Sequence, residues 1–190
     1  MNKDEEVRIM ILSAARRVFQ KWGLNKSTME DIAREAGKGK STLYYYFKSK
    51  EDIFEIIALE EVEGITHKAR RVMSQISSAK EKLKSYITIS MTEIKQTINL
   101  YPIVRGEING NKEFIDKISS KIDKQDELMI AEILKQGIES GEMGFVDITN
   151  IDKAASVING ILKSLINYLI FENDDSEKMD IALKLITEGM

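Results

Sequence analysis

At 190 residues and 43% hydrophobic, the chain can bury one substantial core or two small ones, and its single proline favours helix. It lacks cysteine, which excludes disulfides and thiolate metal sites, and it has no apolar run of the roughly 18 residues that span a membrane, so we expect a cytoplasmic protein without a membrane span. The net charge of −3 is divided unevenly. Residues 1–50 carry 11 Lys/Arg and 6 Asp/Glu (+5), and residues 51–190 carry 17 and 25 (−8), so DNA would attract only the N-terminal part.

Two amphipathic helices are predicted first. The first covers residues 4–22, in which apolar side chains recur at spacings of three and four and are expected to face inward, Trp22 among them. The second begins at Thr28, which forms a capping-box pattern with Asp31. The pattern also occurs one position earlier, so the start is Ser27 or Thr28. Gly37 then follows as a residue able to take the left-handed conformation that ends a helix.

The third predicted helix, Lys40 to Phe47, carries lysine, hydroxyl groups and three consecutive tyrosines. Leu43 and Phe47, four residues apart, can anchor it to a core, which leaves the polar side chains on its other faces. Ser49 caps the helix that follows. Lys50 in its first turn has the wrong sign for the helix dipole, which we attribute to contact with a phosphate. This order of elements predicts a helix-turn-helix that lies in the DNA major groove.

Beyond this unit the sequence predicts long helices. One runs from Ser49 to Met73 and joins the two parts without a flexible linker, and Gly64 inside it is either a close-packing position or a soft point. The fold class is therefore all-α, with about nine helices in two domains, residues 1–48 and 49–190. The remaining helices are expected near residues 78–98, 111–140, 150–172 and 176–189, with a brief one near Pro102.

The segment from Ile9 to Ile57 resembles the DNA-binding domain of the TetR family of transcriptional regulators. The run ILSAARRVFQKWGLNKSTMEDIAREAG is similar to the first two helices of that family, and KGKSTLYYYFKSKEDIFEII is similar to its recognition helix and the start of its fourth helix. Three positions depart from the family pattern. Lys38 stands where a small apolar residue is usual, Gly39 where a Ser or Thr cap is usual, and Ser41 where Gly is common. These departures bear on sequence specificity.

The resemblance implies a homodimer that binds a palindromic operator in double-stranded DNA. Side chains at the front of a recognition helix enter the groove deepest, and hydroxyl and lysine groups donate well to phosphate oxygens. We therefore predict base-edge contacts for Lys40, Ser41 and Tyr44, and phosphate contacts for Thr28, Thr42, Tyr45, Tyr46 and Lys50.

The resemblance also implies that the last two helices form a four-helix interface with a second copy. The apolar face of residues 150–172 is too wide for a helix that touches only one neighbour. The alternative is that these helices simply complete the core of one chain. The face expected at the interface consists of Ile158, Leu162, Leu165, Leu169, Ile181 and Leu185.

Two functions are compatible with this organisation. The first is a ligand-responsive repressor that leaves its operator when a small hydrophobic effector binds among the middle helices. A ligand against residues 65–72 would then tilt the connecting helix, with Gly64 as its soft point. The second is a DNA-binding dimer whose C-terminal domain serves only dimerisation or protein contact. Candidates for the pocket lining, which suit a plain core equally well, are Tyr86, Met91, Tyr101, Phe114, Met129 and Ile133.

Enzymatic activity is not expected. The one histidine, His67, has no partner at ligand spacing, and the sequence contains no Walker loop, GxSxG or GxGxxG motif. Asp123, Asp126 and Glu127 lie at helical spacing among lysines, which is typical of a solvated face rather than of metal ligands. We therefore expect no catalytic residue, no metal site and no cofactor.

Overall fold

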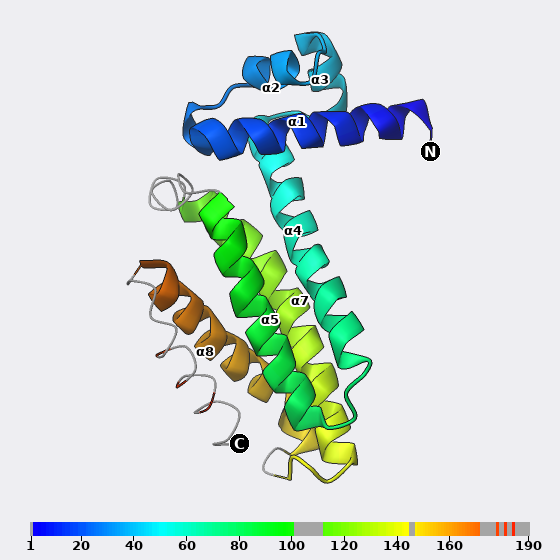
Figure 1. Ribbon diagram of the computed structural model, residues 1–190, viewed down its shortest axis with the longest axis vertical. Coiled ribbons are helices and arrows are strands. Elements are labelled where there is room, and N and C mark those ends of the chain that lie inside the picture. The colour runs from blue at the N-terminus through cyan, green and yellow to red at the C-terminus, as the bar shows by residue number, and fades with distance from the viewer. Residues whose placement is uncertain are drawn as a thin grey trace. The chain divides into compact units, whose positions relative to one another are not determined.

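The computed structural model describes residues 2–100, 112–144 and 147–171, and the single positions 178, 181 and 184. These residues form seven α-helices and one 3-10 helix, and they contain no β-strand. In chain order the elements are α1 (Lys3–Lys26), α2 (Met29–Glu35), α3 (Lys40–Tyr46), α4 (Lys50–Met73), α5 (Ala79–Leu100), α7 (Lys112–Glu139), the 3-10 helix η2 (Ile148–Asn150) and α8 (Ile151–Phe171) (Figure 1).

The all-α class is confirmed, and the long helices lie within a few residues of their predicted bounds. The described residues hold seven α-helices rather than the nine expected. The two others were expected near Pro102, which lies outside the described residues, and at 176–189, where only positions 178, 181 and 184 are described.

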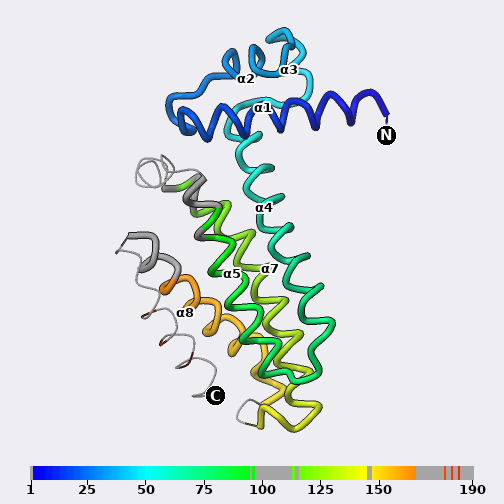
Figure 2. Tube along the Cα trace, viewed as in Figure 1, coloured from blue at the N-terminus to red at the C-terminus, as the bar shows by residue number. Residues whose placement is uncertain are grey.

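The chain folds as two compact units. The first contains Met1–Val62 with Thr97–Ile118, and the second contains Glu63–Gln96 with Ser119–Met190. Figure 2 shows α4 as one uninterrupted trace, and the units divide within this helix.

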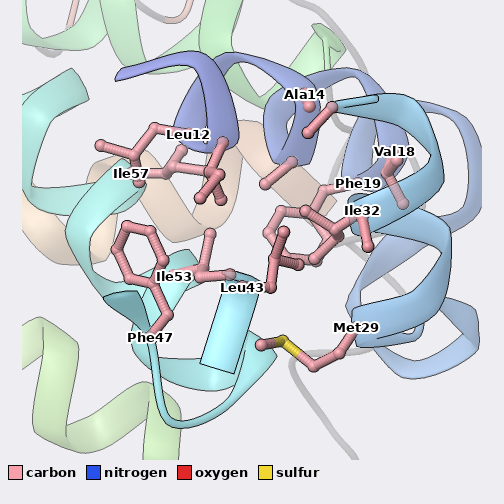
Figure 3. Close-up of a cluster of buried hydrophobic side chains, with 14 of the residues drawn as sticks. Leu12, Ala14, Val18, Phe19, Met29, Ile32, Leu43, Phe47, Ile53 and Ile57 are labelled. Carbon is pink, nitrogen blue, oxygen red and sulfur yellow. The ribbon is translucent and has the colours of Figure 1, made fainter. Parts of the chain in front are cut away.

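The first unit is built around one apolar core, to which α1, α2, α3 and the start of α4 all contribute (Figure 3). Phe19, Ile32 and Leu43 are completely buried, and the ring of Phe19 meets that of Phe54 edge to face, with the centroids 5.5 Å apart. Burial of each such side chain stabilises the fold by about 1.5–3 kcal/mol. This core fixes the position of the short helix α3, which is too short to be stable alone.

The expected inward position of Trp22 is wrong. Its side chain is 49% exposed. The helical conformation of α1 breaks at the next residue, Gly23, which has φ 76° and ψ 174°, and beyond this break Leu24 rather than Trp22 joins the core of Ile11, Ala15 and Phe19. Only glycine adopts this backbone conformation without strain.

The turn between α2 and α3 has the geometry predicted from Gly37. This residue has φ 62°, its N–H donates to the carbonyl of Arg34 at 3.2 Å, and the N–H of Lys38 donates to the carbonyl of Ala33 at 2.9 Å. These two bonds form a Schellman motif, which satisfies the last carbonyls of α2. The motif sets the direction in which α3 leaves the turn.

The second unit has its own apolar core, formed by the C-terminal half of α4 with α5, α7 and α8. Gly137 in α7 is needed for close packing, because an added Cβ would lie 2.6 Å from Sδ of the buried Met143. Gly64 and Gly160, by contrast, have no described atom within 4 Å of an added Cβ. The close-packing interpretation of Gly64 is therefore wrong within this chain.

Candidate nucleic-acid interface

The helix α3 presents its polar and aromatic side chains to solvent because two apolar residues on its opposite face anchor it to the core. Leu43 and Phe47 are buried in the core of the first unit, whereas Tyr45 is 77% exposed. Lys40, Ser41 and Tyr44 are exposed as well, and Thr42 and Tyr46 are half-buried. The side chains predicted to contact base edges therefore share the accessible surface of one short helix.

The start of α2 is capped as predicted from Thr28. The Thr28 hydroxyl accepts a hydrogen bond from the N–H of Asp31 at 3.1 Å, and the Asp31 carboxylate accepts from both the N–H and the hydroxyl of Thr28. The hydrogen bond from the hydroxyl is the main reason that the pKa of Asp31 lies below its ordinary value. Thr28 is exposed, but its hydroxyl is already paired within this capping box.

Lys50 has a different environment from the one inferred from the sequence. Its Nζ donates to the carbonyl oxygens of Leu24, Asn25 and Ser27 at 2.8, 3.1 and 2.9 Å, and its side chain is only 22% exposed. An ammonium group has three donors, and all three are used here. These carbonyls, which follow the break in α1, account for the cation within the chain, so its presence does not require a phosphate.

Two other side chains predicted to contact DNA have carboxylate partners in the first unit. Lys40 forms an ion pair with Glu30 of α2, and the Tyr46 hydroxyl donates to Oδ1 of Asp4 in α1 at 2.8 Å. Each carboxylate raises the pKa of its partner above the ordinary value, because it stabilises the protonated form of Lys40 and of Tyr46.

The pocket candidates of the second unit lie mostly in its core. Tyr86, Met91, Met129 and Ile133 are all buried there, whereas Tyr101 and the side chain of Phe114 lie outside the described residues. Met129 and Ile133 also line a hollow of about 160 Å³ on the surface of this unit. The rest of the lining consists of Arg70, Met73, Ser74, Lys82, Glu132 and Gln136.

A polar cluster interrupts the core of the second unit, and sequence reasoning missed it. The buried hydroxyl of Tyr86 donates to Oδ1 of Asp126 at 2.5 Å, and burial is the main cause that raises the pKa of Asp126. Lys163 pairs with Asp123 at 2.7 Å, and the buried Oδ1 of Asn159 has no hydrogen-bond partner among the described residues. The interpretation of Asp126 as part of a solvated face was wrong, because the face that carries it packs against α5.

The apolar face of α8 is divided between the core and the surface. Ile158 and Leu162 are buried in the second unit, whereas Val157 is 62% and Ile161 44% exposed. Leu165 is half-buried, the side chain of Leu169 and the whole of Leu185 lie outside the described residues, and Ile181 is exposed. The side chains available to a second copy are thus rotated around the helix from Ile158 and Leu162.

A helix-turn-helix with an exposed basic and aromatic helix, joined by α4 to a helical second unit, defines a DNA-binding transcriptional regulator rather than an enzyme. Residues 11–57 match the profile of the bacterial regulatory proteins of the tetR family, and residues 65–188 match the QacR-like protein C-terminal region. The chain belongs to the TetR family of transcriptional regulators, as the resemblance of residues 9–57 predicted.

Individual relatives are similar over most of their length. The transcriptional regulator QacR of Staphylococcus aureus is 30% identical over 159 residues, which cover 80% of this chain and 82% of QacR. The fatty acid metabolism regulator protein of Bacillus subtilis is 31% identical over 136 residues, 71% of this chain and 70% of that protein. The crystal structure of FadR from Bacillus subtilis in complex with stearoyl-CoA superposes on this chain with a TM-score of 0.74. The sequence identity is 26%, and the match covers 96% of this chain and 99% of FadR.

No helix within the described residues is both long and apolar enough to cross a membrane. The same residues contain no group of three or more His, Cys, Asp or Glu side chains placed to hold a metal ion.

Proposed function

We propose that this regulator is a homodimeric repressor that leaves a palindromic operator when a small hydrophobic ligand binds its second unit. The observation that carries the DNA part is the exposed face of α3, where Lys40, Ser41, Tyr44 and Tyr45 stand on a helix anchored by Leu43. These groups supply donors for base edges and phosphates in one accessible patch. Two copies related by a two-fold axis would read two half-sites of one palindrome.

The proposed dimer uses the exposed part of α8. Val157 and Ile161, one helical turn apart, form an apolar strip on its surface, and Gly160 between them leaves room for a close approach of a second helix. Such a strip on a folded unit is a common mark of a protein interface. The partner of this surface is then the same surface of a second copy, because a two-fold interface is self-complementary.

The proposed ligand is an amphipathic acid derivative, with long-chain acyl-CoA as the first compound to test. Two observations support this class. A relative regulates fatty acid metabolism and a structural neighbour holds stearoyl-CoA. The hollow on the second unit combines the apolar Met73, Met129 and Ile133 with the cations of Arg70 and Lys82. At about 160 Å³ it is smaller than an ordinary ligand pocket, so binding would have to widen it.

The proposed release mechanism works through α4. Arg70 and Met73 line the hollow and belong to this helix. Its first residue, Lys50, donates hydrogen bonds to three carbonyl oxygens of the first unit. A ligand that binds one orientation of α4 better than another shifts the equilibrium by its differential affinity, and by no more. Operator affinity falls if the favoured orientation changes the spacing of the two recognition helices.

The test begins with the operator. DNA selected by the protein from a random pool should contain an inverted repeat with half-sites one or more DNA turns apart. Fluorescence anisotropy on that duplex, with and without stearoyl-CoA, measures release. A thermal shift with stearoyl-CoA, free fatty acid and CoA alone measures binding separately, because any ligand of the native state raises its stability. Absence of both binding and release would favour a second unit that serves only dimerisation or protein contact, and selected DNA without an inverted repeat would refute the dimeric mode.

A further inference from the structure

The two ends of α3 are both held by carboxylates from other helices of the first unit. Its first residue, Lys40, pairs with Glu30 in the first turn of α2. Its last residue, Tyr46, donates a hydrogen bond from its hydroxyl to Asp4 in the first turn of α1. The carboxylates also contribute to the start of a helix, where negative charge is favourable, so each has a second stabilising role. They therefore lie beside α3 before any DNA is bound.

Both contacts can open when a competing anion arrives. All four side chains keep contact with solvent, and Lys40 and Glu30 are both exposed. Water and salt screen pairs of this kind, so each is worth little by itself. A DNA phosphate or a base edge offers Lys40 an acceptor of its own. DNA binding at Lys40 then exchanges one acceptor for another instead of gaining a new contact.

When Lys40 exchanges Glu30 for a DNA phosphate, the free energy of binding carries an additional cost. Once Lys40 leaves, the Glu30 carboxylate stays next to a polyanion with its charge no longer neutralised. Non-specific binding comes almost entirely from phosphate contacts, so the repulsion by Glu30 lowers non-specific affinity without compensation. At the correct operator, the contacts of Lys40 with base edges in the groove offset it. Specificity is a difference between two affinities, and a penalty on the wrong partner increases it.

We propose that Glu30 is a specificity-determining residue, which competes with DNA for Lys40 and thereby weakens binding to non-operator sequences more than binding to the operator, and that Asp4 competes with DNA phosphates for Tyr46 in the same way and weakens binding to both kinds of sequence. The proposal rests on the DNA contacts proposed for these two residues of α3. It assigns the acidic residues a role that their positions at helix starts do not require.

Another ion pair in the first unit provides a matched control. Arg17 of α1 pairs with Glu35 of α2 at 2.6 Å, and neither residue belongs to α3. Glu35→Gln therefore removes one negative charge from the same helix as Glu30→Gln without releasing a side chain of α3. Any effect of net charge alone appears equally in both variants.

The experiment measures affinity for the selected operator and for a scrambled duplex of equal length, by fluorescence anisotropy at several salt concentrations. Glu30→Gln should strengthen binding to the scrambled duplex roughly two- to fivefold, the range that follows from the worth of an exposed ion pair. Operator affinity should rise less, so the ratio of the two affinities should fall. Asp4→Asn should strengthen binding to both duplexes, because the phosphate expected to accept from Tyr46 is present in each.

A double-mutant cycle separates competition from simple repulsion. In a Lys40→Met background, Glu30→Gln should no longer change affinity for scrambled DNA, and in a Tyr46→Phe background Asp4→Asn should have no effect. The proposal is overturned if Glu30→Gln and Glu35→Gln act equally, if the effect of Glu30→Gln persists without Lys40, or if the affinity ratio is unchanged. If wild-type protein binds the selected operator and the scrambled duplex equally well, the operator function is refuted instead. The double-mutant cycle on scrambled DNA would then still show whether Glu30 and Asp4 compete with DNA for Lys40 and Tyr46.

Discussion

The ammonium of Lys50, in the first turn of α4, lies 2.8 Å from the carbonyl oxygen of Leu24 at the end of α1. It also donates hydrogen bonds to the carbonyl oxygens of Asn25 and Ser27, so it caps the last residues of α1 and the start of the connection to α2. The contact couples the first turn of α4 to the segment that immediately precedes the Thr28 cap of the helix-turn-helix. A cation at the start of a helix is unfavourable for that helix, and these carbonyls offset the cost.

Replacement of Lys50 by Met should therefore reduce stability before it reduces DNA contact. Loss of a charged donor to three carbonyls, two of them part-buried, should lower the free energy of unfolding by about 1–3 kcal/mol. Urea denaturation measures this change. The salt dependence of operator binding should stay near that of wild type, because the ammonium has no free donor for a phosphate. A salt slope that falls by about one unit with stability unchanged would restore the phosphate assignment.

Gly64→Ala should stabilise the protein. The site is an exposed position inside α4, and an added Cβ meets no described atom within 4 Å, so the gain should approach the roughly 1 kcal/mol by which Ala exceeds Gly in a helix. If α4 yields at this residue when ligand binds, the same change should reduce the loss of operator affinity caused by ligand. Gly137→Ala is the control, since its Cβ would collide with Met143 and should destabilise the protein. An unaltered ligand response in Gly64→Ala would remove this residue from the switch.

The two sides of α8 should respond differently to substitution. Ile161→Glu puts a charge on the exposed strip and should shift the protein towards monomers in analytical ultracentrifugation, with the first unit still folded. Leu162→Ala, one residue along the helix, instead opens a cavity in the core of the second unit and should cost about 2–5 kcal/mol of stability. If Ile161→Glu sediments like wild type, the dimer uses another surface.

The Asp126–Tyr86 contact should make stability depend on pH. Burial raises the pKa of Asp126 above its ordinary value of 3.8, so the folded state binds the proton more tightly than the unfolded state. Its contribution to stability is therefore full below pH 3.8 and is lost as the pH rises through the folded-state pKa. Asp126→Asn, which keeps an acceptor for the Tyr86 hydroxyl, should gain stability relative to wild type at neutral pH and lose that advantage in acid. Denaturation midpoints of both proteins across pH measure the difference, and a difference independent of pH would contradict this assignment.

Local patterns in the sequence were sufficient to predict the helix-turn-helix and the class of protein. The capping box of Thr28 and Asp31, the left-handed Gly37 and the cap at Ser49 each depend on residues no more than five positions apart. Such features form wherever the chain can make a helix, because their hydrogen bonds close within one turn. Periodicity likewise placed the long helices, since an apolar stripe must be buried against some neighbour.

Only the tertiary structure decided which neighbour each face meets. Periodicity defines the apolar side chains of α8 but does not tell which of them pack in the core, where Ile158 and Leu162 are buried. Lys50 and the carbonyl of Leu24 are 26 positions apart in the chain, and Tyr86 and Asp126 are 40 apart. A charged or polar side chain takes whichever partner the packing of separate helices brings within about 3 Å. A local sequence pattern does not contain the information on which two distant residues will come that close.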